Sequence, residues 1–271
     1  MNEQPSEKPR IKIEKKGSFF QTDKEGFIIN PTSPEKIQDK WKPVLDDIVA
    51  WHKEAFGGSL KNVYVRGSVA KGDATENVSD VDTFAYVDLT EEEIDAKAEA
   101  IKTERIELDK KYPFVHGVEI IIMSLEKSNK KSEIVLLNQS LCIYGDPVDH
   151  PRLKPGKDLI LHAPNIDKRI KSIGGFMKED HSDERIKSKC VWIMKRLLRV
   201  GCEIVIERSG KYTRDLYPCY EVFSEYYPEK ESEMREALEL ALNPTANKEK
   251  IQKIMHNMGE FLQKETSKYL L

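Results

Sequence analysis

Two aspartates, Asp80 and Asp82, lie one residue apart in "VYVRGSVAKGDATENVSDVDTFAYVD" (63–88), a stretch that otherwise has the pattern of a buried strand. Side chains at positions i and i+2 of a strand point to the same face, so we expect the two carboxylates to project together. Two like charges so close repel each other and favour a shared cation. Carboxylate oxygens suit Mg²⁺, which completes its shell with water and substrate phosphates. The sequence therefore predicts a magnesium site near the start of this strand.

Other residues extend the predicted site. Glu119 interrupts the apolar strand "HGVEIIIMS", where a lone carboxylate is costly unless it faces a site. Gly67 and Ser68 fall at a strand-to-helix turn, where a hydroxyl and backbone N–H groups can hold phosphate oxygens. Lys71 and Arg66 add positive charge nearby. Such a set is typical of phosphoryl transfer, in which catalysis is mostly positioning and charge neutralisation.

Composition restricts the classes of protein to which the chain can belong. Of its 271 residues, 39% are hydrophobic and 34% charged, with a formal net charge of −3. This balance argues against a chain dedicated to nucleic acid, although a local basic groove is not excluded. No apolar run could span a bilayer, and the polar N-terminus lacks the apolar core of a signal peptide. We therefore expect a cytoplasmic protein with no membrane partner, whose four cysteines are reduced.

The hydrophobic pattern changes along the chain and predicts an α+β protein. Helical periodicity from Pro34 to Phe56 is followed by alternating strands and helices, and after about residue 160 only helical segments remain. Strands are expected in "VYVRG", "VDTFAYVDL", "GVEIIIMSL" and "LCIYG", and helices at 91–111 and 126–139. The predicted domains are a polar N-terminal extension (1–33), an α/β domain (34–155) and a helical bundle (156–271).

The combination of "GS" at 67–68, "DVD" at 80–82 and a later acid in an apolar strand resembles the polymerase-β-type nucleotidyltransferase superfamily. Within it, the chain is most similar to the aminoglycoside adenylyltransferases of the streptomycin and spectinomycin type. The similarity continues more loosely through "KCVWIMKRLLRVGCEIVIERSGKYTRDLYPCYEVFSEYYPE", which resembles the C-terminal helical domain of that group. Coverage is roughly residues 60–245.

This resemblance implies that Asp80 and Asp82 bind Mg²⁺ and that Ser68 contacts the triphosphate of ATP. It implies that Glu119 matches the glutamate that serves as general base in the streptomycin-type enzymes, although a metal-ligand role stays open. Lys211 and Arg214 are then candidates for contacts with nucleotide phosphates. The implied reaction moves AMP from ATP to a hydroxyl group of a small acceptor, for which an aminoglycoside-like molecule is the candidate. The resemblance is compatible with a monomer or a homodimer.

Alternatives remain open at this stage. The aspartates could be solvated residues of a turn, and Glu119 could simply pair with a lysine or an arginine. Lys211 and Arg214 follow a helix end, where basic residues are common for electrostatic reasons. The chain could instead be a toxin-like nucleotidyltransferase that modifies RNA or protein, or a nucleotide-binding sensor without catalysis. No histidine has the spacing of a metal ligand, and none is assigned a role.

Overall fold

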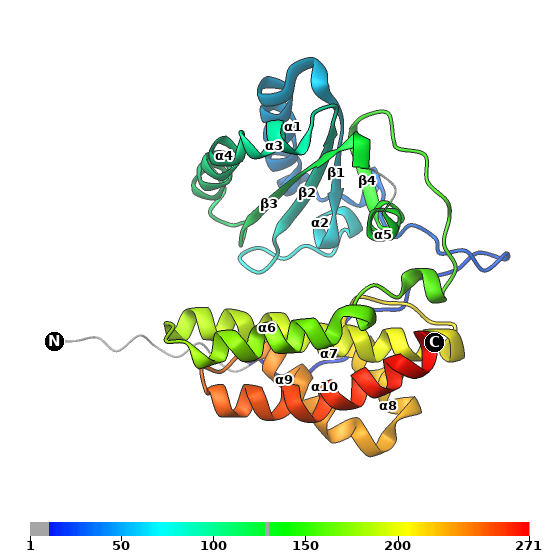
Figure 1. Ribbon diagram of the computed structural model, residues 1–271. Coiled ribbons are helices and arrows are strands. Elements are labelled where there is room, and N and C mark those ends of the chain that lie inside the picture. Colours follow the sequence, from blue (N-terminus) through cyan, green and yellow to red (C-terminus); the bar gives the residue numbers. More distant parts are fainter. Residues whose placement is uncertain (1–10, 128–129, 271) are drawn as a thin grey trace. The chain divides into compact units, whose positions relative to one another are not determined.

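The computed structural model describes residues 11–127 and 130–270, which form two compact units (Figure 1). One unit is Gln21–Leu153, and the other joins the described residues before Gln21 to those from Lys154 onward. Within the described residues, the expected extension 1–33 is divided, with 11–20 in the helical unit and 21–33 in the α/β unit. The α/β character of the first unit and the helical character of the second are confirmed.

A four-stranded mixed sheet with the order β3-β2-β1-β4 organises the α/β unit. Its strands are β1 (Leu60–Arg66), β2 (Val81–Val87), β3 (Val118–Ser124) and β4 (Ser140–Gly145). β1 runs antiparallel to both of its neighbours, while β2 and β3 are parallel. In β2 every residue except Asp82 is buried, as expected for a central strand covered on both faces. Asp82 is therefore the one charged residue of this strand and the one that is not fully buried.

Helices cover the sheet on two faces. They are α1 (Lys42–Phe56), α2 (Gly67–Lys71), α3 (Glu91–Asp95), α4 (Ala98–Lys111) and α5 (Lys131–Leu137). One apolar cluster joins Trp41 and Ile48 of the α1 region and Leu108 of α4 to Val65 and Ile120 of the sheet. On the opposite face, three aromatic residues of the sheet pack with Leu137 of α5: Tyr64, Phe84 and Tyr86. Because side chains alternate along a strand, Asp82 belongs to the aromatic face.

Three predicted helices are shorter than expected, and the one expected at 126–139 is represented by α5, Lys131–Leu137. The helix expected from Pro34 begins only at Lys42, because two single 3₁₀ turns, Pro34–Lys36 and Asp39–Trp41, precede it. The helix expected at 91–111 is divided into α3 and α4. A capping box at Thr90, whose hydroxyl and backbone N–H both pair with Glu93, fixes the start of α3.

The helical unit is built around one long helix, α7 (Asp183–Ser209). It packs with α6 (Ile166–Lys178), α8 (Leu216–Tyr226), α9 (Glu231–Leu242) and α10 (Lys248–Leu270). From Val200 to Ile206 every residue of α7 is buried, so the helix is enclosed on all sides there. Glu203 is the only charged residue in that run, and it therefore needs internal partners.

The described N-terminal residues are attached to the helical unit by hydrogen bonds. The backbone N–H of Phe20 donates to the carbonyl of Tyr212 (2.8 Å), and the hydroxyl of Thr213 donates to the carbonyl of Ser18 (2.7 Å). The backbone N–H of Ser18 donates to Asp215 (3.0 Å). The chain thus begins its described course on the helical unit before it enters the α/β unit. Among the described helices, none combines the length and the apolar character that crossing a membrane requires.

Candidate active site

The turn between β1 and α2 depends on glycine. Gly67 has φ +76°, a conformation that L side chains rarely adopt. A Cβ at this position would lie only 2.7 Å from Oδ2 of Asp82, closer than real Cβ contacts. Two features of this position therefore favour glycine: the positive φ and the close approach of the Asp82 carboxylate. The half-buried Ser68 follows Gly67 at this turn, and Lys71 ends the short helix α2.

Three charged residues from neighbouring strands form a row across the sheet, which we call the charged row: Arg66, Asp82 and Glu119. Arg66 pairs with Asp82 in the antiparallel register, and Asp82 pairs with Glu119 in the parallel register. Nη2 of Arg66 lies 3.2 Å from Oδ1 of Asp82 and 2.5 Å from Oε2 of Glu119. The side chains of Arg66 and Asp82 are each 24% exposed, and that of Glu119 is 47% exposed. The row thus borders the aromatic face and is open to solvent at Glu119.

The electrostatics of the row favour a bound cation. Burial raises the pKa of Glu119, the neighbouring Asp82 raises it further, and the positive charge of Arg66 opposes both effects. A guanidinium nitrogen therefore already occupies a cation position between two carboxylates. Nε of Arg66 is buried and lacks a hydrogen-bond partner within the described part of the chain. Carboxylate oxygens that converge on a positive charge are the donor set that Mg²⁺ prefers, so these residues fit the metal that the sequence predicts.

Asp80 is placed differently from Asp82. It precedes the first residue of β2 and is exposed, and its Oδ1 lies 3.4 Å from the position that a Cβ on Gly117 would occupy. Across residues 11–127 and 130–270, no three His, Cys, Asp or Glu side chains are already arranged to hold a metal ion. The convergence of Asp80, Asp82 and Glu119 on Mg²⁺ therefore stays a prediction.

The two basic residues predicted in the helical unit have different surroundings. Nζ of Lys211 lies 3.6 Å from Glu225 and 5.2 Å from the ring centre of Phe19. The charge of Arg214 lowers the pKa of His162, and its backbone carbonyl lies 3.4 Å from Nε of Arg199. Their predicted contacts with nucleotide phosphates stay predictions.

Sequence reasoning missed a group of four arginines in the helical unit, which we call the arginine cluster: Arg169, Arg196, Arg199 and Arg214. Each of the four lowers the pKa of His162. A sequence signal existed, because polar Arg196, Arg199 and Glu203 recur at spacings of three and four along one face of an otherwise apolar helix. His162 itself carries no such signal.

Comparison with known proteins connects this geometry to an activity. Residues 48–139, which contain the turn and the charged row, match the family described as nucleotidyltransferase domain. The fold is similar to the crystal structure of the spectinomycin adenyltransferase AAD(9) from Enterococcus faecialis with ATP and spectinomycin. That match has a TM-score of 0.53 at 13% sequence identity and covers 82% of this chain and 99% of that chain. No curated protein sequence matches at a significant level. The resemblance and the fold class expected from the sequence are confirmed.

Proposed function

We propose that this chain, a nucleotidyltransferase enzyme whose domain lies at residues 48–139, moves AMP from ATP to a hydroxyl group of a small molecule and releases pyrophosphate. The observation that carries the proposal is the charged row beside the Gly67–Ser68 turn. Three neighbouring strands bring a carboxylate pair and an arginine to one end of the sheet, next to a turn whose positive φ favours glycine. Charge and backbone donors are thus placed together where phosphoryl transfer needs them.

The residues of the row have separate roles in the proposed reaction. Asp80 and Asp82 would hold Mg²⁺, which when bound neutralises charge on the phosphate oxygens. Ser68 and Lys71 bind phosphate at the turn. Arg66 acts as the counter-ion of Asp82 and Glu119, and its positive charge opposes the rise that burial causes in the pKa of Glu119.

Glu119 is the general base of the proposed mechanism. Its carboxylate accepts the proton of the acceptor hydroxyl, and the hydroxyl oxygen then forms a bond to the α-phosphorus of ATP. The bond between that phosphorus and the oxygen that bridges to the β-phosphate breaks, so pyrophosphate leaves with the electron pair. A raised pKa brings Glu119 closer to neutral pH, where a carboxylate is a more effective base.

The acceptor is proposed to be of the aminoglycoside type, with support from the fold shared with AAD(9). The test is a panel of hydroxyl acceptors incubated with ATP and Mg²⁺, with pyrophosphate release and a nucleotide-monophosphate mass addition as the two measurements. Asp82→Asn, tested in parallel, separates enzymatic transfer from background hydrolysis. Binding of ATP without pyrophosphate release for any acceptor would contradict the proposal and favour a nucleotide sensor.

A further inference from the structure

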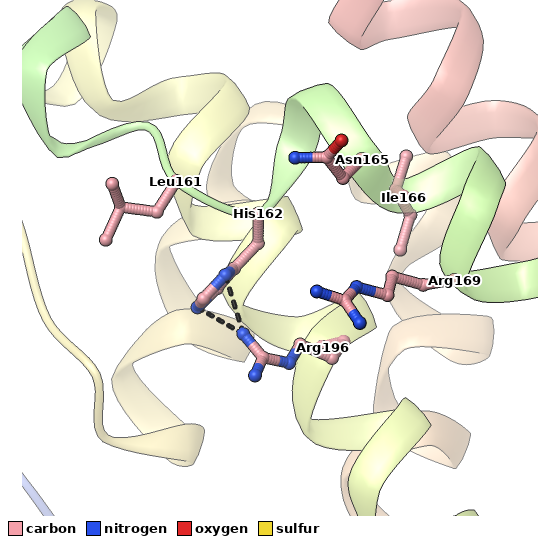
Figure 2. Close-up of a pocket in the computed structure, with 6 residues that line it drawn as sticks. All are labelled: Leu161, His162, Asn165, Ile166, Arg169 and Arg196. Carbon is pink, nitrogen blue, oxygen red and sulfur yellow. Dashed lines mark hydrogen bonds between the residues drawn. The ribbon is translucent and has the colours of Figure 1, made fainter. Parts of the chain in front are cut away.

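A pocket opens in the helical unit (Figure 2). It has an empty volume of about 260 Å³, part of which is open to solvent. It is lined by four polar or basic residues and two apolar ones: His162, Asn165, Arg169, Arg196, Leu161 and Ile166. Figure 2 shows the guanidinium groups of Arg169 and Arg196, which come from α6 and α7, on the same side of the pocket.

The arginine cluster around this pocket has no carboxylate partner. None of Arg169, Arg196, Arg199 and Arg214 forms a salt bridge with a residue of the described chain. The buried acid next to them, Glu203, is already engaged elsewhere. Its carboxylate accepts hydrogen bonds from the backbone N–H groups of His162 (2.8 Å) and Ala163 (2.8 Å). The four guanidinium groups therefore have one buried carboxyl group near them, and that group is already hydrogen-bonded to the backbone.

Positive charges repel one another within this cluster. Burial and the neighbouring arginines lower the pKa of Arg196, and they lower that of Arg199 to about 10. Like charges in a partly buried place repel strongly, because the effective dielectric constant there is well below that of water. The repulsion is relieved when an oxyanion accepts hydrogen bonds from the guanidinium groups.

His162 and Trp192 hold the guanidinium groups in place. Nη1 of Arg196 lies 2.6 Å from Nδ1 of His162 and 2.8 Å from its Nε2 (Figure 2). Because a guanidinium only donates, the accepting ring nitrogen carries no proton, and burial with the arginine charges lowers the pKa of His162 to about 2. The guanidinium groups of Arg196 and Arg169 lie 5.1 Å and 5.5 Å from the ring of Trp192. Both arginines are thus preorganised by neutral or aromatic neighbours.

We propose that this pocket is an oxyanion site that binds a phosphate group through Arg169 and Arg196, with the amide of Asn165 as a further donor. The planar fork of arginine matches phosphate oxygens in a bidentate way, and Arg196 keeps unused N–H groups after its contact with His162. The phosphate could belong to a nucleotide or to a separate phosphorylated compound. The site stands on the helical unit alone and does not depend on nucleotidyl transfer.

The first test is isothermal titration of the full chain with inorganic phosphate and with pyrophosphate. Arg196→Met and Arg169→Met are each expected to weaken binding about tenfold or more, since each removes charge-assisted hydrogen bonds. The matched controls are Lys168→Met on α6 and Lys187→Met on α7. Both lysines are exposed and lie outside the pocket lining, so their loss changes the net charge equally without touching the site.

Thermal unfolding separates a lost site from a damaged fold. Removal of one repelling charge should leave the melting temperature of Arg196→Met equal to or above that of the wild type without phosphate. Phosphate should then raise the melting temperature of the wild type and of both lysine variants but not that of Arg196→Met. The proposal is overturned if phosphate and pyrophosphate bind both arginine variants as tightly as the wild type, or if the lysine controls lose as much affinity.

A third titration, with a non-hydrolysable ATP analogue, identifies the source of the phosphate. Equal weakening of the analogue and of pyrophosphate in Arg196→Met supports a nucleotide phosphate. Weakening of inorganic phosphate alone supports a separate phosphorylated ligand. Asp82→Asn should lose transfer yet keep phosphate binding at the pocket, so a failure of the proposed function and a failure of this site give different results.

Discussion

Replacement of Gly67 by alanine should disturb the charged row without removing any charge. The new Cβ would lie 2.7 Å from Oδ2 of Asp82, and ordinary contact begins at 3.4 Å, so the carboxylate must retreat by about 0.7 Å. A left-handed conformation costs a non-glycine residue about 1–2 kcal/mol, and an off-rotamer Asp82 adds about 0.5–1.5 kcal/mol. We expect Gly67→Ala to lower the free energy of unfolding of the α/β unit by about 2–3 kcal/mol.

Activity should fall further than stability suggests. A displacement near 1 Å of a catalytic group can reduce turnover by about 10²-fold, so kcat for pyrophosphate release should fall by about that factor at saturating ATP. Denaturant unfolding measures the first effect and steady-state kinetics the second.

The matched control is Gly57→Ala, at the other end of β1. Gly57 also has a positive φ, +49°, but a Cβ there meets no atom within 4 Å. It should lose about 1–3 kcal/mol of stability through backbone strain while kcat stays at the wild-type value. Equal kcat in Gly67→Ala and in the wild type would refute the reasoning, because the position of Asp82 against the turn would then not matter for transfer.

Three further predictions concern single acids. Asp82→Asn should reduce transfer by at least about 10³-fold while the melting temperature changes little, which activity and thermal scans together can check. Glu119→Gln should keep ATP binding in a titration but lose about 10²–10⁴-fold in turnover. In the wild type, the raised pKa of Glu119 should place the acid limb of the pH–rate profile at a higher pH than an exposed glutamate would. An unchanged acid limb in the variant would exclude Glu119 as the base. Burial raises the pKa of Glu203 from 4.5 to about 7, so the folded state binds its proton more tightly than the unfolded state. The contribution of this group to the free energy of unfolding should therefore be highest below about pH 4.5 and fall by about 3 kcal/mol as the pH rises to about 7. Denaturant titrations at several pH values should find this pH dependence missing in Glu203→Gln.

Much of the fold could be predicted from periodicity, and the errors have local causes. The strands around Asp82 and Glu119 were predicted because β-branched and aromatic residues alternate or run together there. The start of α1 was predicted too early, since Ser33 and Pro34 form a good helix start in sequence but begin only a single 3₁₀ turn. Propensity fixes that a turn begins there, whereas the packing of Trp41 decides where the α-helix itself starts.

The candidate site was predictable in parts. Gly67, Ser68, Asp80 and Asp82 lie within sixteen residues, so their spacing alone indicates a turn followed by acids on a strand. Arg66 was noted only as a nearby charge, and its position between two carboxylates could not be derived from its place before a Gly-Ser turn. The arginine cluster was not recognised because its members come from three segments that are separate in the sequence: α6, α7 and the loop before α8.

The amino-acid sequence by itself determined the local chemistry: a glycine where φ must be positive, a hydroxyl beside it, and carboxylates in strands that otherwise exclude charge. Tertiary structure decided which charges meet. Residues 66, 82 and 119 share one row only because the antiparallel register of β1 with β2 and the parallel register of β2 with β3 align them. Register is set by hydrogen bonds and burial across distant segments, and a shift of one residue would turn Asp82 to the other face of the sheet. The interactions that align these charges therefore join segments that are distant in the sequence, and no short stretch of sequence can reveal them.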